Sequence, residues 1–193
     1  LMFTYAISLT LLNTYINYYL MRQIGLILTS FSVITNLNAQ SFFDMDNISN
    51  IEIYFSQNNW NELMINNYYT EEYLLADSVI FNGMMKDSVG VKYKGNSTFS
   101  EGNDKNPLNI SIDYIKSNQD YQGHETIKLS NGQKDASCLW EALSYEIARN
   151  YMQAPRSNYA KVYINGSYHG LYTNSESVNS DFQNNYLYSD KDN

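Results

Sequence analysis

The feature that most constrains the fold is a hairpin signal, Asn165-Gly166, which separates two apolar segments near the end of the chain. A two-residue type I′ turn needs positive φ at both central positions, and Asn and Gly adopt that conformation at little cost. The turn therefore predicts two paired antiparallel strands, at 160–164 and 168–173. Asn82-Gly83 supplies a second tight turn, directly after the segment 74–81.

Five other segments also read as strands, because most of them alternate apolar and polar residues or are rich in β-branched residues. They are 51–55, 74–81, 89–94, 108–115 and 126–129. Two segments have helical spacing instead. Ser56 is predicted to cap a short helix that carries Trp60, and 138–151 is predicted to be an amphipathic helix that stops near Pro155. The polar segment 175–193 is expected to contain no closing element.

The composition excludes several classes of protein. A net charge of −8 without a basic run argues against nucleic-acid binding, because neutralising phosphates requires clustered Lys and Arg. The single cysteine, Cys138, cannot form an internal disulfide, and we interpret it as a small buried apolar residue. The two histidines, His124 and His169, lack metal-ligand spacing, so no metal site is expected.

Residues 21–40 have the layout of a secretory signal peptide. Met21-Arg22 begins a positive stretch, an apolar run follows over 24–37, and Ala39 is the small residue at the expected cut after Ala39 or Gln40. We therefore expect a bacterial protein that is secreted or displayed at the cell surface and that meets a membrane only through its leader. Residues 1–20 are interpreted as upstream translated sequence. The alternative is an uncleaved anchor over 1–37, although polar residues interrupt its apolar stretch.

Six strings in the mature part, 41–193, resemble the CotH (spore coat protein H) kinase family, in the same order. They are VKYKGNST (91–98), KNPLNI (105–110), GHETIKLSNG (123–132), KD (134–135) with the helix 139–150, APRS (154–157), and VYING through GLY (162–172). The colinear resemblance covers roughly 88–182, and 47–87 is compatible but weaker.

The resemblance implies an α+β fold similar to the small lobe of an atypical protein kinase, with an antiparallel sheet, one main helix and the large lobe missing. It also implies transfer of phosphate from ATP, with Mg²⁺ or Mn²⁺, to Ser or Thr of a protein substrate. The order of predicted elements (strand, Gly-containing loop, strands, helix, hairpin) agrees with such a lobe.

The nucleotide-binding candidates follow from this order. Lys128, on the strand before the helix, and Lys94, directly before Gly95, are alternative phosphate-binding cations. Glu141, in the first turn of the helix, is the preferred partner for such a lysine, although a local role at the helix dipole is a rival; Glu146 is the second choice.

A loop and a hinge complete the candidates. Gly95, Asn96 and Ser97 could surround phosphate with backbone N–H groups. Glu176 opens a segment, 176–179, that would line an adenine pocket mainly with its backbone, whereas Arg156 is expected to have a structural hydrogen-bonding role.

No catalytic residue is expected within the printed sequence, because the family places its catalytic and metal-binding carboxylates beyond the hinge. We interpret Asp181, Asp190 and Asp192 as solvated and expect this fragment to be inactive alone. One alternative is a non-catalytic secreted or cell-surface binding or adhesion module. A third interpretation is a secreted α+β domain of unrelated function.

Overall fold

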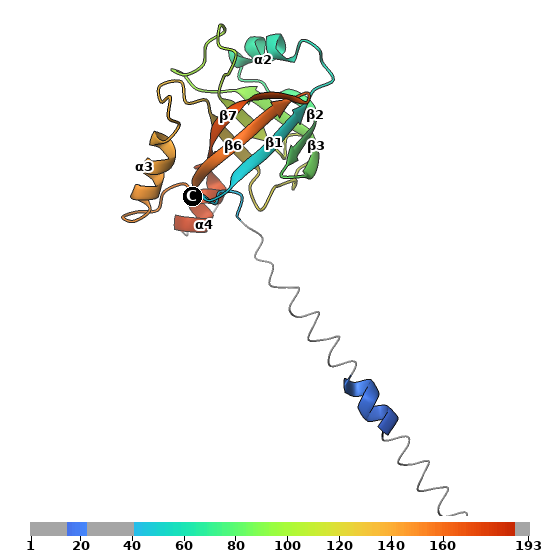
Figure 1. The fold of residues 1–193 in the computed structure, drawn as a ribbon. Coiled ribbons are helices and arrows are strands. Elements are labelled where there is room, and N and C mark those ends of the chain that lie inside the picture. The colour runs from blue at the N-terminus through green and yellow to red at the C-terminus, as the bar shows by residue number, and fades with distance from the viewer. Residues whose placement is uncertain (1–14, 23–40, 188–193) are drawn as a thin grey trace, which may run out of the picture. The chain divides into compact units, whose positions relative to one another are not determined.

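The computed structural model describes residues 15–22 and 41–187, and the chain divides into two units, 1–40 and 41–193 (Figure 1). In the first unit, residues 15–22 form a helix. Most of the predicted signal peptide, with its cleavage site, lies outside the described residues, as do Asp190 and Asp192. None of the described helices combines the length and the apolar character that a membrane span requires.

Seven strands of the second unit close into a barrel in the order β1-β2-β3-β4-β5-β7-β6 (Figure 1). Their bounds are β1 Ile48–Tyr54, β2 Leu74–Phe81, β3 Met84–Tyr93, β4 Leu108–Ser111, β5 Thr126–Ser130, β6 Ser157–Ile164 and β7 Ser167–Glu176. All neighbouring pairs are antiparallel except β1 and β6, which run parallel. Closure pairs the edges that an open sheet would leave free.

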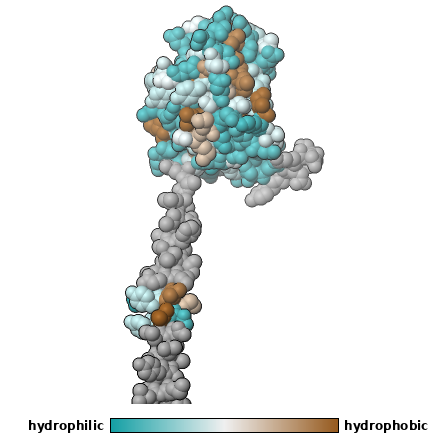
Figure 2. All heavy atoms as spheres, turned by 90° about the vertical axis from the view of Figure 1, so that its right-hand side faces the viewer, coloured by the Kyte–Doolittle hydropathy of each residue, from teal (hydrophilic) through white to brown (hydrophobic). Residues whose placement is uncertain are grey.

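Every second residue along each strand points into the barrel and fills its core, as the alternating sequence pattern predicts. Inward residues such as Ile51, Val79, Ile110 and Leu129 are fully buried, while their chain neighbours face outward. The outer surface shown in Figure 2 is accordingly mostly hydrophilic, with apolar side chains in small separate patches.

Both predicted hairpin turns are present. Asn82 and Gly83 have φ values of 49° and 87°, and Asn165 and Gly166 have values of 48° and 78°, as type I′ turns require. The turns join β2 to β3 and β6 to β7.

The predicted fold class is wrong: the domain is a closed mixed barrel and not a kinase-like small lobe. The difference arises at β1, whose Ile51 pairs in parallel register with Val162 of β6 and so joins the two ends of the sheet. Pairing between segments so distant in sequence is set by burial in the folded core, and local alternation carries no information about it.

Short helices replace the predicted main helix. They are α2 Trp60–Tyr68, α3 Trp140–Ala148 and α4 Ser180–Leu187. Asn59, and not Ser56, occupies the N-cap of α2, because the Ser56 hydroxyl donates to Asp77 Oδ1 at 3.3 Å. Helix α4 forms within the tail that we expected to contain no closing element, and Phe182 on α4 is buried.

Helix α3 presents its apolar stripe to solvent. Leu139, Leu143 and Ile147 are 51%, 52% and 52% exposed, whereas Ala142 is its buried residue. An amphipathic stripe ordinarily faces the core, but α3 contacts β6 and β7 through its other side. Cys138, predicted to be buried, is only half-buried and has a φ of +57° in the turn that precedes α3.

Candidate functional site

A row of polar side chains crosses four strands on the outside of the barrel. Lys92 of β3 lies opposite Asn109 of β4, Asn109 lies opposite Lys128 of β5, and Lys128 lies opposite Ser175 of β7. Residues adjacent to this row, such as Leu129, are buried in the core, so the row faces outward. Cross-strand register thus brings together residues from four separate segments.

Lys94 joins this row in an open groove with a volume of about 440 Å³. Lys94 lies two residues after Lys92 and therefore on the same side of the strand. The groove is lined by Tyr68, Tyr69, Glu71, Lys92, Tyr93, Lys94, Gly95, Asn96, Asn109 and Lys128. The structure therefore brings together four of the predicted residues, Lys94, Gly95, Asn96 and Lys128, whereas Ser97 is exposed and does not line the groove.

The groove carries an excess of positive charge. Burial is the main cause that lowers the pKa of Lys94, the Lys128 ammonium lowers it further, and the Glu141 carboxylate opposes both. Among the described residues, neither the Lys94 nor the Lys128 ammonium has a carboxylate oxygen within 4.0 Å. Two like charges that share one surface favour an anionic ligand between them.

Glu141 is held beside the row by the barrel. Ser175 Oγ donates to Glu141 Oε1 at 2.8 Å, which fixes the carboxylate of α3 over the end of β7. Glu146, the second candidate, forms an ion pair with Arg149 on the same helix and is half exposed. Of the two glutamates, Glu141 is therefore the one that influences Lys94.

The loop after β3 turns sharply at Gly95. Its φ is +93°, a backbone conformation that residues with a side chain rarely adopt. A Cβ at this position would also collide with the Thr98 hydroxyl, so only glycine fits here. The loop closes with a hydrogen bond from Phe99 N to Gly95 O at 3.2 Å. The Phe99 ring stacks on Tyr68 with centroids 3.6 Å apart, which fixes the loop to α2 at the rim of the groove.

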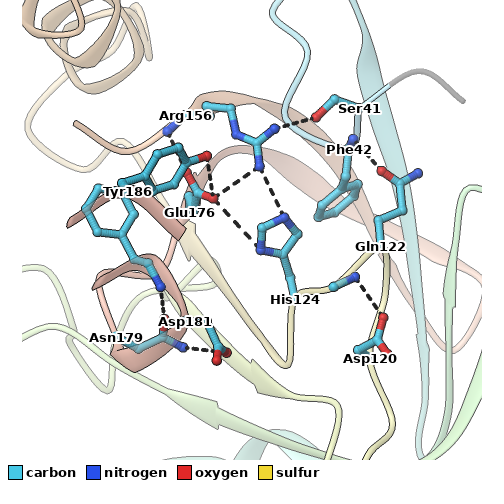
Figure 3. Close-up of polar contacts among 12 residues, drawn as sticks. Ser41, Phe42, Asp120, Gln122, His124, Arg156, Glu176, Asn179, Asp181 and Tyr186 are labelled. Atoms are coloured by element: carbon cyan, nitrogen blue, oxygen red, sulfur yellow. Dashed lines mark hydrogen bonds and ion pairs between the residues drawn. The ribbon is translucent and has the colours of Figure 1, made fainter. Parts of the chain in front are cut away.

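The Glu176 side chain lies outside the groove, in a separate buried cluster (Figure 3). Arg156 Nη2 donates to Glu176 Oε1 at 3.1 Å, and the Tyr186 hydroxyl of α4 donates to the same oxygen at 3.3 Å. The Glu176 backbone N–H is bonded to Arg156 O at 2.9 Å. The structural hydrogen-bonding role predicted for Arg156 is confirmed, and Glu176 ties α4 to the barrel.

His124 completes this cluster, and sequence reasoning missed it. Its Nδ1 lies 4.0 Å from Glu176 Oε1. Burial is the largest effect on the His124 pKa and lowers it; Arg156 lowers it too, whereas Glu176, Asp181 and Asp120 raise it. Asp181, predicted to be solvated, lies in the first turn of α4 and borders a small polar cavity beside His124. Spacing in the sequence offers no signal for a cluster whose members are dozens of residues apart.

Within 15–22 and 41–187, no group of three or more His, Cys, Asp and Glu side chains is arranged to hold a metal. The groove offers the ammonium groups of Lys92, Lys94 and Lys128 as donors and Asn109 Oδ1, which has no hydrogen-bond partner among the described residues, as an acceptor.

Comparison with protein-family models finds a match to the family described as CotH kinase protein, over residues 91–193. The match covers more than half of the chain and includes the groove lysines, α3, the last hairpin and α4. A search of curated proteins finds no match.

Proposed function

This chain belongs to the CotH kinase protein family, and we propose that its groove binds the phosphates of ATP in a protein that transfers phosphate to Ser or Thr. From the composition of residues 21–40 we infer that the protein is exported and that its substrates are secreted or surface proteins.

The observation that carries the proposal is the convergence of Lys94 and Lys128 on one groove, in a chain with a net charge of −8. The two ammonium groups repel each other, and a bound phosphate would replace that repulsion with attraction at both positions. Charge-assisted hydrogen bonds of this kind are about twice as strong as neutral ones.

The remaining groove residues suit the rest of such a ligand. Backbone N–H groups at Gly95 and Asn96 could face phosphate oxygens, as they do in anion-binding turns. Asn109 Oδ1 has no hydrogen-bond partner among the described residues and offers an acceptor to a hydroxyl or amino group. A magnesium ion would arrive bound to the nucleotide phosphates, because Mg²⁺ is usually held through them and a few carboxylates.

Binding is tested by titrating the full chain with ATP and Mg²⁺ in a calorimeter. Lys94→Met and Lys128→Met should each weaken binding about 10- to 100-fold, the range expected for losing a hydrogen bond to a charged group. Lys161→Met is the matched control, because Lys161 is an exposed lysine of β6 that does not line the groove. Equal affinity in all three variants would place the nucleotide elsewhere.

Transfer is tested separately in the full-length protein that contains this domain, with γ-labelled ATP and a general protein acceptor. Label on Ser or Thr that is lost in Lys94→Met or Lys128→Met supports the kinase activity. If the groove binds tripolyphosphate as tightly as ATP and no label is transferred, the groove is a general anion site, and this result argues against the kinase.

A second function, a non-catalytic binding or adhesion module, is favoured by the solvent-exposed apolar stripe of α3. Leu143, Ile147 and Trp140 are 52%, 52% and 69% exposed, and clustered apolar side chains of this kind often mark protein contacts. This function predicts that the double variant Leu143→Ser, Ile147→Ser loses surface attachment while Lys128→Met retains it.

A further inference from the structure

Ser175 lies at the centre of a short chain of hydrogen bonds between the barrel and α3. Its Oγ donates to Glu141 Oε1 at 2.8 Å and lies 2.9 Å from Ser157 Oγ. Ser157 and Ser175 are cross-strand partners on β6 and β7, and only 0% and 4% of their surface is exposed. Two buried hydroxyls therefore connect rigid strands to a carboxylate on a helix.

Counting protons fixes the direction of this chain. An ionised carboxylate only accepts hydrogen bonds, so the single Ser175 proton must point to Glu141. Ser175 Oγ can then only accept from Ser157, whose proton is shared with the Asn174 carbonyl at 3.2 Å. Each hydrogen bond in such a series polarises the next, which strengthens the hydrogen bond from Ser175 to the Glu141 carboxylate.

We propose that Ser175 is a positioning residue, which holds the Glu141 carboxylate beside the row of polar side chains, next to Lys128 and within the electrostatic reach of Lys94. Its consequence for ligand binding rests on the function proposed above, whereas the positioning itself concerns only residues of this chain.

Helix α3 alone does not hold Glu141 in place. Asp135 Oδ2 accepts from Trp140 N at 2.7 Å and so holds the helix start, but this bond does not reach the Glu141 side chain, and Ala142 is the only buried residue of α3. A glutamate in the first helical turn would otherwise sample several rotamers, because nothing on the helix itself fixes its side chain. The rival role of Glu141, stabilising the helix dipole, requires no partner on β7.

The charges around Lys94 make the positioning measurable. Glu141 raises the Lys94 pKa and Lys128 lowers it, while Lys92 and Glu71 also line the groove. If Ser175 no longer holds Glu141, the carboxylate that raises the Lys94 pKa acts on it more weakly, so this pKa falls further below its ordinary value.

The experiment measures the Lys94 pKa in the full chain, without nucleotide, from the pH dependence of its labelling by an amine reagent. Ser175→Ala and Glu141→Gln should both lower this pKa, and the double variant should lower it no further than Glu141→Gln. Ser175→Thr, which keeps the hydroxyl, should restore it. Ser49→Ala is the control, because Ser49 is equally buried and its hydroxyl donates to the Phe42 carbonyl at 3.3 Å, on a different part of the barrel.

An unchanged Lys94 pKa in Ser175→Ala overturns the proposal, and so does an unchanged pKa in Glu141→Gln. If Ser175→Ala does not fold, Ser175→Cys retains the volume with a weak donor and should also lower the pKa. The Lys94 pKa and the binding of ATP are measured separately. If Ser175 positions Glu141 but the protein does not bind ATP, only the proposed function is refuted.

Discussion

The Glu176 carboxylate accepts two hydrogen bonds from Arg156. Arg156 Nη2 donates to Oε1 and the Arg156 backbone N–H donates to Oε2, each at 3.1 Å. Because Arg156 precedes β6 and Glu176 ends β7, this pair secures the end of the barrel to which α4 is attached through Tyr186 (Figure 3).

Removing the charge of this pair should destabilise the domain. Glu176→Gln leaves the Arg156 guanidinium without its counter-charge, and we expect a loss of about 2 kcal/mol in the free energy of unfolding. The loss is below that of a fully buried pair because the Arg156 side chain is 35% exposed. Urea unfolding measures it. Glu146→Gln, in the exposed pair with Arg149, should cost less than about 0.5 kcal/mol, and equal losses in both variants would contradict this account.

Stability should fall in mild acid. The pKa values of His124 and His169 are both lowered, mainly by burial, so the unfolded chain binds more protons than the folded one. The contribution of the two neutral histidines to stability is complete above their ordinary pKa of 6.5 and is lost as pH falls through their lowered pKa values in the folded state. Thermal unfolding across this range, with His124→Asn and His169→Asn as comparisons, measures the effect. A flat profile in the native protein would refute the prediction.

The hairpin turn at Asn165-Gly166 should not tolerate a side chain at its second position. Gly166 has a φ of +78° with nothing within 4 Å of the Cβ position, so Gly166→Ala tests backbone strain alone. We expect a loss of about 1–2 kcal/mol in the free energy of unfolding. Gly102→Ala is the control, with equal space and no positive φ, and should be neutral. A neutral Gly166→Ala would mean that the turn differs from type I′.

Because the α3 stripe is exposed, truncating a leucine on it should cost much less stability than truncating a leucine in the barrel core. Leu129 is fully buried in the barrel and Leu143 is 52% exposed. Leu129→Ala should cost about 2–5 kcal/mol, whereas Leu143→Ala should stay within about 0.5 kcal/mol of the native protein. Chemical denaturation of both variants provides the measurement, and a large loss in Leu143→Ala would show that the stripe is buried.

Local patterns correctly predicted the elements whose conformation is set by neighbouring residues. The two Asn-Gly turns have the positive φ values that a type I′ turn requires, and β2 has the bounds that were predicted for it. Lys94 and Gly95 were proposed as candidates because a strand end followed by glycine is a local feature, and both line the groove. Strand β4, by contrast, ends at Ser111, four residues before its pattern does.

Only the tertiary structure decided how these elements meet. Whether Ile51 pairs with Val162, and thus whether the sheet closes, depends on burial shared between segments more than a hundred residues apart. The row from Lys92 to Ser175 also exists only because cross-strand register aligns its residues. Likewise, only the folded structure decides that Glu141, and not Glu146, influences Lys94. The sequence alone determined the strands, the turns and the family, because these depend on local backbone preference and on the order of residues. The barrel, the exposed stripe of α3 and the charges gathered in the groove depend on long-range contacts, which no local pattern specifies.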